Sequence, residues 1–262
     1  MKKKPLISII TVNLNNLEGL KKTMASVVNQ TWKEFEYIVI DGGSKDRTKE
    51  YLESQTNNID YWISEKDSGI YNAMNKGIKV ATGEYLLFLN SGDALFSNEI
   101  LYQNYKFLTL YDIVYFNLNV VDEKKTFIKK YPDQLLFSYF VNDTLPHPAT
   151  FIRKAVFNTT GLYDESLKIV ADWKFFIQSI CKLNCTYKRI DETLSTFYLD
   201  GLSSEPSNRH LIIAEKQKVL KADYQAYMED NKLLFELKKT LANLRESKKI
   251  KLLVKLGFIN KF

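Results

Sequence analysis

The sequence is poor in cysteine and has no long apolar segment. Its two cysteines, Cys181 and Cys185, have no second pair of cysteines or histidines at zinc-ligand spacing, so they do not predict a zinc site. We expect both thiols to be reduced, as is typical of a cytoplasmic protein. The longest apolar run, Tyr85–Leu89, is far shorter than the ~20 residues that a membrane-spanning helix requires. We therefore expect a cytoplasmic globular protein, either free or peripheral at the inner face of the cell membrane.

Three motifs that mark large enzyme classes are also missing. No G-x-G-x-x-G follows the first predicted strand, which argues against a dinucleotide-dependent dehydrogenase. No G-x-x-x-x-G-K-[ST] is present, which argues against a P-loop enzyme. No G-x-S-x-G occurs either, so the chemistry of the α/β-hydrolases is unsupported. The chemistry must therefore come from other polar residues.

Net charge is scarce in most of the chain and concentrated near its C-terminal end. The formal net charge is +6. Residues 209–262 hold 13 Lys and Arg against 6 Asp and Glu, whereas residues 1–208 hold 24 against 25. A neutral body and a basic run without a recognition fold are atypical of a nucleic-acid-binding protein, so we expect no nucleic acid partner.

Strand-like and helix-like segments alternate through the N-terminal part of the chain. The pattern predicts buried strands over residues 5–12, 35–40, 59–64 and 85–90, and helices over residues 17–28, 46–53 and 69–81. This alternation predicts a parallel sheet with helices on both faces. Ligands of such sheets bind at the carboxyl ends of the strands, where polar clusters at Asn13, Asp41 and Asn90–Asp93 follow three of the predicted strands.

The remainder is less regular. It predicts strands over residues 112–121, 127–131, 149–153 and 186–189, an amphipathic helix over residues 172–183, and helical structure from about residue 208 onward.

The first polar cluster joins Asn13 and Asn15 with Asp41. A carboxylate at a strand end can accept a hydrogen bond from a ring N–H, which uracil offers at N3 and cytosine does not. Alternatively, Asp41-Gly42-Gly43-Ser44 is only a turn and a helix cap, since Asp and Gly favour turns and Ser caps helices. The residues alone leave both interpretations open.

Two further carboxylate sites have similar alternatives. Asp93, at the end of Asn90-Ser91-Gly92-Asp93, suits a hard cation that also takes substrate phosphates as ligands. Alternatively, the segment is only a turn, with Asp93 as a helix cap. Asp172, considered together with Asp164, lies among aromatic residues at the start of a predicted helix. Partial enclosure favours a general base, while the same position also suits an N-cap.

Five segments, in this order and spacing, resemble the family 2 glycosyltransferases of GT-A fold. They are Ile7–Asn13, Ser26–Thr31, Tyr37–Thr48, Asp67–Ile78 and Gly83–Asp93, and the downstream segments His147–Phe151 and Asp164–Trp173 are also similar. The resemblance covers about residues 5–205. It implies an α/β fold of GT-A type, with a Rossmann-like, mostly parallel central sheet and flanking helices, to which this chain adds a C-terminal helical tail. The implied catalytic domain is 1–207, with a nucleotide-binding half (about 1–95) and an acceptor half (about 96–207), and the tail is 208–262.

The resemblance also implies an activity, namely the inverting transfer of a sugar from a nucleotide diphosphate donor to an acceptor hydroxyl. We expect a hexosyltransferase with a UDP-sugar as donor. We expect its acceptor to be a lipid-linked saccharide or a growing polysaccharide. Asp172 matches the family's catalytic base, and Asp93 matches the last carboxylate of the motif that binds Mn²⁺ or Mg²⁺. The donor is expected to contact Thr11, Asn13, Asn15, Asp41, Asp67, Tyr71, Asn75, Asn90 and Ser91. Trp173 is expected to contact the acceptor, and His147 either the metal or the acceptor.

The chain departs from the family pattern at its acidic residues. Asn90-Ser91-Gly92-Asp93 has one carboxylate where the family commonly has two or three, and Ala171 replaces the acidic neighbour of Asp172. These departures support one alternative, a catalytically weak or inactive membrane-associated binding or assembly protein on a glycosyltransferase scaffold. That alternative predicts no turnover with any donor.

The tail has two apolar patterns. Leu234, Leu237, Leu241 and Leu244 follow a 3-4-3 spacing, which predicts a helix seam that docks on the body or pairs with a second chain as a homodimer. Residues 238–262 hold eight Lys and Arg against one Glu, and Leu252, Leu253, Leu256 and Ile259 form an apolar stripe among them. This combination is typical of a helix on an anionic membrane surface, and also compatible with a solvated basic end.

Overall fold

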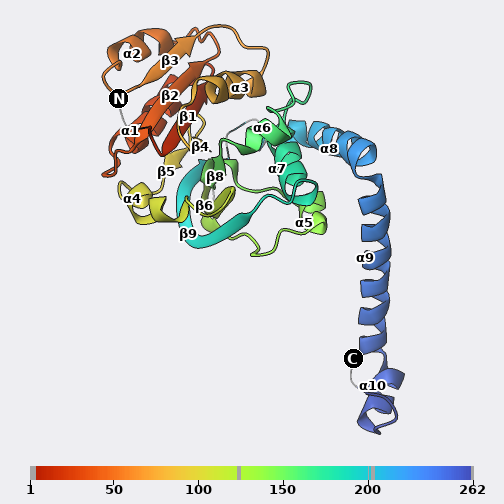
Figure 1. Cartoon of the computed structure of the whole chain (residues 1–262). Coiled ribbons are helices and arrows are strands. Elements are labelled where there is room, and N and C mark those ends of the chain that lie inside the picture. Colours follow the sequence, from red (N-terminus) through yellow and green to blue (C-terminus); the bar gives the residue numbers. More distant parts are fainter. Residues whose placement is uncertain (1–3, 123–124, 200, 202–203, 261–262) are drawn as a thin grey trace. The chain divides into compact units, whose positions relative to one another are not determined.

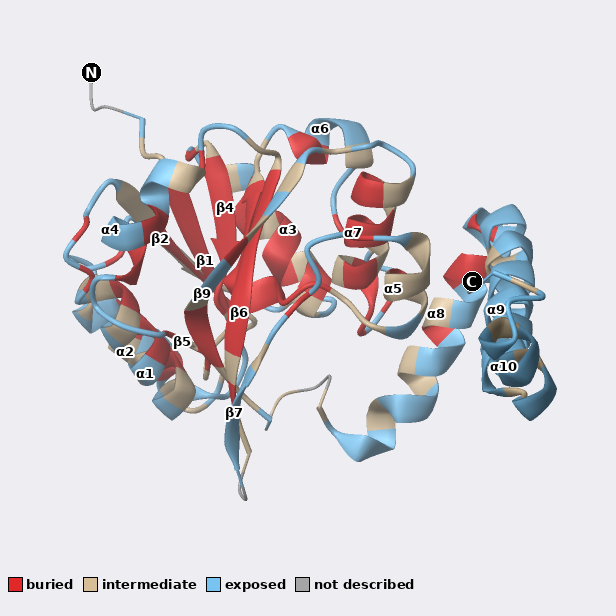
Figure 2. Cartoon of the chain, turned by 90° about the horizontal axis from the view of Figure 1, so that it is seen from below, coloured by how far each residue is buried: buried red, intermediate tan, exposed pale blue. Residues whose placement is uncertain are grey.

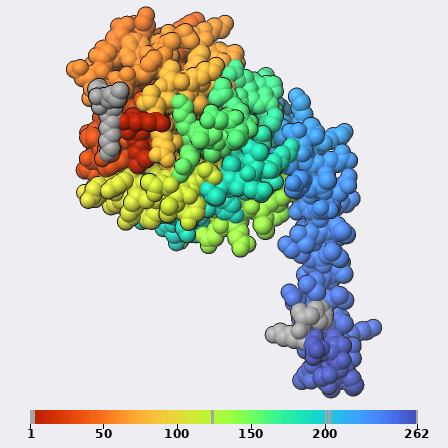
Figure 3. All heavy atoms as spheres, viewed as in Figure 1, coloured from red at the N-terminus to blue at the C-terminus, as the bar shows by residue number. Residues whose placement is uncertain are grey.

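A central sheet with flanking helices forms most of the first of two compact units. The computed structural model describes residues 4–122, 125–199, 201 and 204–260. The chain divides into the units Met1–Glu215 and Lys216–Phe262. Within the first unit, the N-terminal segments and the later green segments form one continuous surface (Figure 3).

The strands of the described chain join in one sheet. They are β1 (Ile7–Asn13), β2 (Phe35–Asp41), β3 (Tyr61–Ser64), β4 (Tyr85–Phe88), β5 (Ala94–Leu95), β6 (Ile113–Val121), β7 (Thr126–Lys129), β8 (Thr150–Arg153) and β9 (Tyr187–Tyr198). Their order is β3-β2-β1-β4-β8-β6-β9-β5, and β7 pairs with β6 (Figure 1).

Helices connect and cover these strands. They are α1 (Leu17–Val28), α2 (Thr48–Ser54), α3 (Ile70–Val80), α4 (Ile100–Asn104), α5 (Phe137–Asn142), α6 (Val156–Thr160), α7 (Ala171–Cys181), α8 (Arg209–Asp223), α9 (Gln225–Glu246) and α10 (Lys248–Lys255). Short 3₁₀ turns occupy Tyr105–Phe107, His147–Ala149 and Pro206–Asn208.

The half of the sheet formed by β3, β2, β1 and β4 is parallel, as the alternation of strands and helices predicts. All seven residues of β1 are buried, because helices cover both faces of the sheet (Figure 2). The helix α3 packs closely on β1, since a Cβ on Gly77 would lie 2.6 Å from Cγ2 of Ile10. The N-terminal pattern of strands and helices is therefore confirmed.

The second half of the sheet differs from the sequence pattern in three places. β8 joins β4 and β6 in antiparallel orientation, so the sheet is mixed beyond β4. β9 runs to Tyr198, well past the expected end near residue 189, because its later residues continue the pairing with β6 beyond a bulge and also pair with β5. The two-residue strand β5 and the helix α5 are too short for any periodicity to reveal them.

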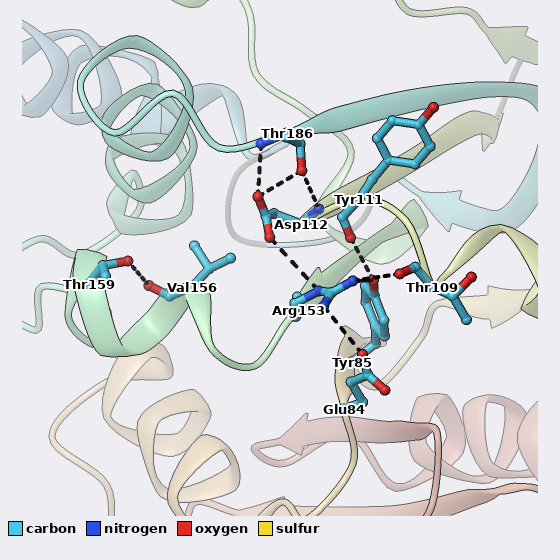
Figure 4. A network of polar contacts seen from close by, with 9 residues as sticks. All are labelled: Glu84, Tyr85, Thr109, Tyr111, Asp112, Arg153, Val156, Thr159 and Thr186. Atoms are coloured by element: carbon cyan, nitrogen blue, oxygen red, sulfur yellow. Dashed lines mark hydrogen bonds and ion pairs between the residues drawn. The ribbon is translucent and has the colours of Figure 1, made fainter.

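A partly exposed arginine, Arg153 at the end of β8, ties the strands together at the sheet edge where β4, β6 and β9 begin (Figure 4). Nη2 of Arg153 donates to the hydroxyl of Tyr85 at 2.7 Å and to the carbonyl oxygen of Thr109 at 2.9 Å. Its guanidinium also pairs with Asp112, which in turn accepts hydrogen bonds from Thr186. This network fixes the position of β8 relative to β4, β6 and β9.

The second unit holds the end of α8 and the helices α9 and α10. Neither α9 nor α10 has a buried residue. Among the described residues, no helix combines the length and the apolar character that crossing a membrane requires.

Candidate active site

The polar ends of three parallel strands lie side by side. Asn13 of β1 pairs in register with Asp41 of β2. The N–H of Ser91, just after β4, donates to the carbonyl oxygen of Val12 at 3.1 Å. The structure therefore brings together Asn13, Asp41 and the segment that begins at Asn90, as expected from the topology of a parallel sheet.

Asp41 is fully buried, and all of its accepting positions are used. Its Oδ1 accepts from Nδ2 of Asn13 (2.9 Å) and from the hydroxyl of Ser44 (2.5 Å), and its Oδ2 accepts from the N–H of Ser44 (3.0 Å) and the hydroxyl of Ser64 (2.6 Å). Burial alone would raise the pKa of Asp41, but these hydrogen bonds outweigh it and hold the pKa below its usual range. A base N–H could reach this carboxylate only by displacing one of these donors.

The two asparagines of the first cluster, Asn13 and Asn15, differ in whether their side-chain oxygen already accepts a hydrogen bond. The exposed side chain of Asn15 accepts from the N–H of Lys45 at 2.9 Å, which holds the loop after β2. Asn13 is 4% exposed, and within the described chain its Oδ1 has no hydrogen-bond partner.

Thr11 is completely buried, and its hydroxyl donates to the carbonyl oxygen of Leu89 and accepts from Tyr37. Thr11 therefore presents no atom to a ligand in this structure.

Asp67 lies against the turn after β2. Its Oδ2 would be 3.2 Å from a Cβ on Gly42, so the missing side chain of Gly42 leaves room for this carboxylate. Burial raises the pKa of Asp67, and the ion pair with Lys76, at 2.5 Å, opposes that shift. Lys76 also pairs with Glu65 at 2.7 Å. Lys76 thus brings a positive charge to this part of the site, and no motif of the sequence points to it.

The turn after β4 presents oxygen ligands. The N–H of Asp93 donates to the carbonyl oxygen of Asn90 at 3.0 Å, and Gly92 between them has φ +108°. Oδ1 of Asn90 is buried and, in the part of the chain that the structure describes, has no hydrogen-bond partner. Hard cations prefer carboxylate and amide oxygens, and they often take substrate phosphates as further ligands. These residues therefore fit a divalent cation held jointly with a donor diphosphate, although among the described residues no group of three or more His, Cys, Asp or Glu forms a cage by itself.

Asp172 lies in the first turn of α7 and is half-buried. The hydroxyl of Tyr71, from α3, lies 2.8 Å from Oδ1 of Asp172 and 2.5 Å from the carbonyl oxygen of Ile169. Burial and the negative charge of Asp172 raise the pKa of Tyr71 well above its usual value, so this hydroxyl keeps its proton. Tyr71, expected to contact the donor, is thus placed beside the candidate base.

Asp164 does not share a site with Asp172. Its carboxylate pairs with Lys174 at 2.8 Å and accepts from the N–H of Ser166 at 3.0 Å. Burial acts to raise the pKa of Asp164, but these partners lower it to about 2. Asp164 is therefore a structural carboxylate at the base of α7.

Asn75, His147 and Trp173, which were expected to contact ligands, are buried and form hydrogen bonds with other residues of the protein. Asn75 is bonded to both backbone groups of Tyr163. His147 stacks on Phe88, and its Nε2 lies 2.8 Å from the hydroxyl of Tyr163. Burial lowers the pKa of His147, with the charge of Asp172 opposing it. Trp173 is 1% exposed, and its indole N–H donates to the carbonyl oxygen of Phe140.

These contacts give His147 and Trp173 packing roles beneath the site. They do not support the expectation that Trp173 contacts the acceptor, because its ring is enclosed by the protein. They also do not support His147 as a metal ligand, because its ring is inserted among aromatic residues.

Comparisons with known proteins show the family of the chain. The family described as Glycosyl transferase family 2 matches residues 8–161. An uncharacterized glycosyltransferase of Mycobacterium tuberculosis is 32% identical over 210 residues, which are 78% of this chain and 79% of that protein. A PGL/p-HBAD biosynthesis glycosyltransferase of Mycobacterium bovis is 32% identical over 181 residues, 66% of this chain and 69% of that protein. The chain therefore belongs to glycosyltransferase family 2, as the motifs indicate.

Solved structures share the fold. S. aureus TarS 1–349 in complex with UDP-GlcNAc aligns with a TM-score of 0.63 at 20% identity, over 83% of this chain and 67% of that one. The mannosyltransferase PcManGT of Pyrobaculum calidifontis, in complex with GDP-Man and Mn²⁺, aligns with a TM-score of 0.58 at 13% identity, over 78% and 59%. At these identities the likeness concerns the fold alone, and it confirms the α/β class of GT-A type.

Proposed function

We propose that this protein is an inverting hexosyltransferase that moves a sugar from a UDP-sugar to an acceptor hydroxyl. The observation that carries the proposal is the hydrogen bond between Tyr71 and Asp172, which fixes a half-buried carboxylate of the acceptor half against the helix that follows β3. A carboxylate held in this way can accept a proton at a defined point.

In the proposed reaction, Asp172 removes the proton of the acceptor hydroxyl. The acceptor oxygen forms its bond to the anomeric carbon from the face opposite the nucleotide, while the bond from that carbon to the diphosphate oxygen breaks. The nucleoside diphosphate leaves with the electron pair, and the configuration at the anomeric carbon is inverted. The hydroxyl of Tyr71 orients Asp172 through its hydrogen bond.

The polar strand ends are proposed to bind the donor. Asn13 offers an unpartnered amide oxygen, which suits the N3–H of uracil, and Asp41 holds Asn13 and Ser44 in place. Asn15, Asp67 and Ser91 lie on the neighbouring segments and complete the proposed donor site. The ion pair of Asp67 with Lys76 places one negative and one positive charge beside the proposed donor site.

A divalent cation, Mn²⁺ or Mg²⁺, is proposed to be held by Asp93 and by Oδ1 of Asn90 together with the donor. When bound, it supplies positive charge that stabilises the leaving diphosphate. The unpartnered oxygen of Asn90 supports this assignment, and so does the Mn²⁺ in the structure of PcManGT.

The acceptor is proposed to be a lipid-linked saccharide or a growing polysaccharide. The relative from Mycobacterium bovis is named for PGL/p-HBAD biosynthesis, and TarS is solved with UDP-GlcNAc, which supports a saccharide-building role and a UDP donor. We propose that the protein acts in the cytoplasm, at the inner face of the cell membrane.

The helix α10 is the proposed membrane contact. Lys248, Lys251 and Lys255 share one side of it, while Leu252, Leu253 and Leu256 are exposed on the remaining surface. Lysines beside exposed leucines complement an anionic lipid surface. The leucines of α9 are also exposed, and their pairing with a second copy of the chain stays a prediction.

The proposed function is tested by incubating the protein with a panel of nucleotide sugars, Mn²⁺ and saccharide acceptors. Transfer from a UDP-sugar with inverted configuration supports the proposal. Binding of UDP without turnover of any donor would instead support an inactive binding or assembly protein on the same scaffold.

A further inference from the structure

A buried carboxylate of α8 holds the backbone segment that precedes Asp172. Glu215 is 8% exposed and belongs to the same compact unit as the site. Its Oε1 accepts from the N–H of Lys168 at 2.7 Å, and its Oε2 accepts from the N–H groups of Ile169 at 3.1 Å and Val170 at 3.3 Å. Three successive N–H groups thus converge on one carboxylate.

This carboxylate holds the backbone that leads into α7. Val170 precedes the first residue of α7, and no side-chain cap bonds to that helix end. N–H groups that converge from successive residues form a concavity for a negative charge, and a negative charge is also favourable near a helix N-terminus. Hydrogen bonds to an ionised acceptor are roughly twice as strong as neutral ones. Glu215 therefore anchors, from another helix, the segment from which α7 starts.

The same segment is held from its other side by Tyr71. The carbonyl oxygen of Ile169 faces the hydroxyl of Tyr71, while the N–H of Ile169 faces Glu215. Asp172 follows Val170 by two residues and also faces Tyr71. The backbone that sets the position of the Asp172 carboxylate is thus fixed by two side chains. Glu215 accepts from its N–H groups, and Tyr71 faces a carbonyl oxygen.

We propose that Glu215 is a positioning residue for the base of the transfer reaction, acting through residues 168–170. This inference rests on the proposed function, in which Asp172 is the base. Without the carboxylate, three N–H groups lose a charged acceptor and the start of α7 is free to shift. A misplacement of about 1 Å can cost about 100-fold in rate, whereas donor contacts at the strand ends are unaffected.

The chain offers a matched control in Glu36. Its carboxylate likewise joins distant segments by accepting from the N–H groups of Thr82 and Gly83 and from the hydroxyl of Ser8. These contacts lie where β1, β2 and β4 begin, at the sheet edge opposite the site. A purely structural loss should therefore appear in both Glu36→Gln and Glu215→Gln, while a positioning loss should appear only in Glu215→Gln.

The experiment measures kcat, the KM for the donor and the Tm of full-length wild type, Glu215→Gln, Glu36→Gln and Asp172→Asn. We expect Glu215→Gln to lower kcat by about 10-fold or more with the donor KM within twofold, and Glu36→Gln to lower Tm while kcat stays within twofold. Equal kcat in Glu215→Gln and wild type, or an equal fall in both glutamine variants, would overturn the inference. Full activity of Asp172→Asn would instead refute the base assignment, so the two failures are distinguishable.

Discussion

The hydroxyl of Tyr71 lies between two oxygen atoms, Oδ1 of Asp172 at 2.8 Å and the carbonyl oxygen of Ile169 at 2.5 Å. It has one proton for two acceptors. When Asp172 is ionised, the hydroxyl can donate to the carboxylate. When Asp172 has taken a proton, the carboxyl group can donate to Tyr71 while Tyr71 donates to Ile169. Tyr71 can therefore hold Asp172, the proposed base, in both of its protonation states.

This relationship predicts the behaviour of Tyr71→Phe. Loss of the hydroxyl removes a hydrogen bond to a charged group, and we expect kcat to fall by about tenfold while the dissociation constant for UDP is unchanged. Steady-state kinetics and calorimetry measure the two quantities.

Tyr85→Phe is the matched control, because Tyr85 also has a bonded hydroxyl but lies in the network of Arg153. It should lower the stability and leave kcat unchanged. A fall in UDP affinity in Tyr71→Phe that matched its loss of kcat would place Tyr71 in the donor site instead.

The ion pair of Asp164 with Lys174 predicts a pH-dependent contribution to stability. The pKa of Asp164 is lowered to about 2, so the contribution is fully present above the unfolded pKa of about 3.9 and is lost as the pH falls towards 2. Because both side chains are partly exposed, we expect a contribution of about 1 kcal/mol.

Denaturant unfolding of Asp164→Asn and wild type measures this difference. It should be about 1 kcal/mol at pH 7 and about half as large near pH 3. A difference that stays constant between pH 7 and pH 3 would show that the charge of Asp164 is not its source.

The proposed metal site predicts a coupling between metal and nucleotide. UDP with Mn²⁺ should raise the Tm of the wild type more than UDP alone, and EDTA should remove the difference, because a ligand stabilises the state that binds it. Asp93→Ala should lose this metal-dependent part and keep any shift caused by UDP alone.

The control for Asp93→Ala is Asp133→Ala, since Asp133 is an exposed carboxylate that pairs with Arg189. It should behave as wild type. If Asp93→Ala kept the full metal-dependent shift in Tm, Asp93 would not be a ligand of the cation.

The tail predicts binding to anionic vesicles. Each basic residue near an anionic surface contributes about 1 kcal/mol, so replacing Lys248, Lys251 and Lys255 by Gln should weaken vesicle binding by about 100-fold. Co-sedimentation with anionic and neutral vesicles at low and high salt measures this effect.

Replacement of Lys49, Lys79 and Lys182 by Gln removes the same charge from exposed positions of the first unit. This control should retain vesicle binding. Equal loss in both triple variants would mean that overall charge, and not α10, is responsible.

The inner strands of the parallel half, β1, β2 and β4, were predictable from the sequence because they are largely buried on both faces. Such strands are apolar throughout, and the polar residues at their ends mark where they stop, as at Asn13 and Asp41. The length of β9 was underestimated, since its exposed and buried residues follow no regular period around a bulge in its pairing with β6.

The partners of the candidate site residues were much less predictable. Tyr71 and Asp172 are 101 residues apart in the chain, and Glu215 and Ile169 are 46 apart. No local pattern links them, because only the packing of α3, α7 and α8 brings them together. The burial of Thr11 and Trp173 has the same origin, since residue type alone does not tell which face of an element is covered.

The proposal that Asp172 is the base of a sugar transfer is tested by its amide variant. Transfer from the active UDP-sugar and binding of UDP are measured for wild type and Asp172→Asn, which keeps the size of the side chain. If Asp172 is the base, kcat should fall by about 10²–10⁴-fold while UDP binds with unchanged affinity. An Asp172→Asn variant that transfers sugar at the wild-type rate would contradict it.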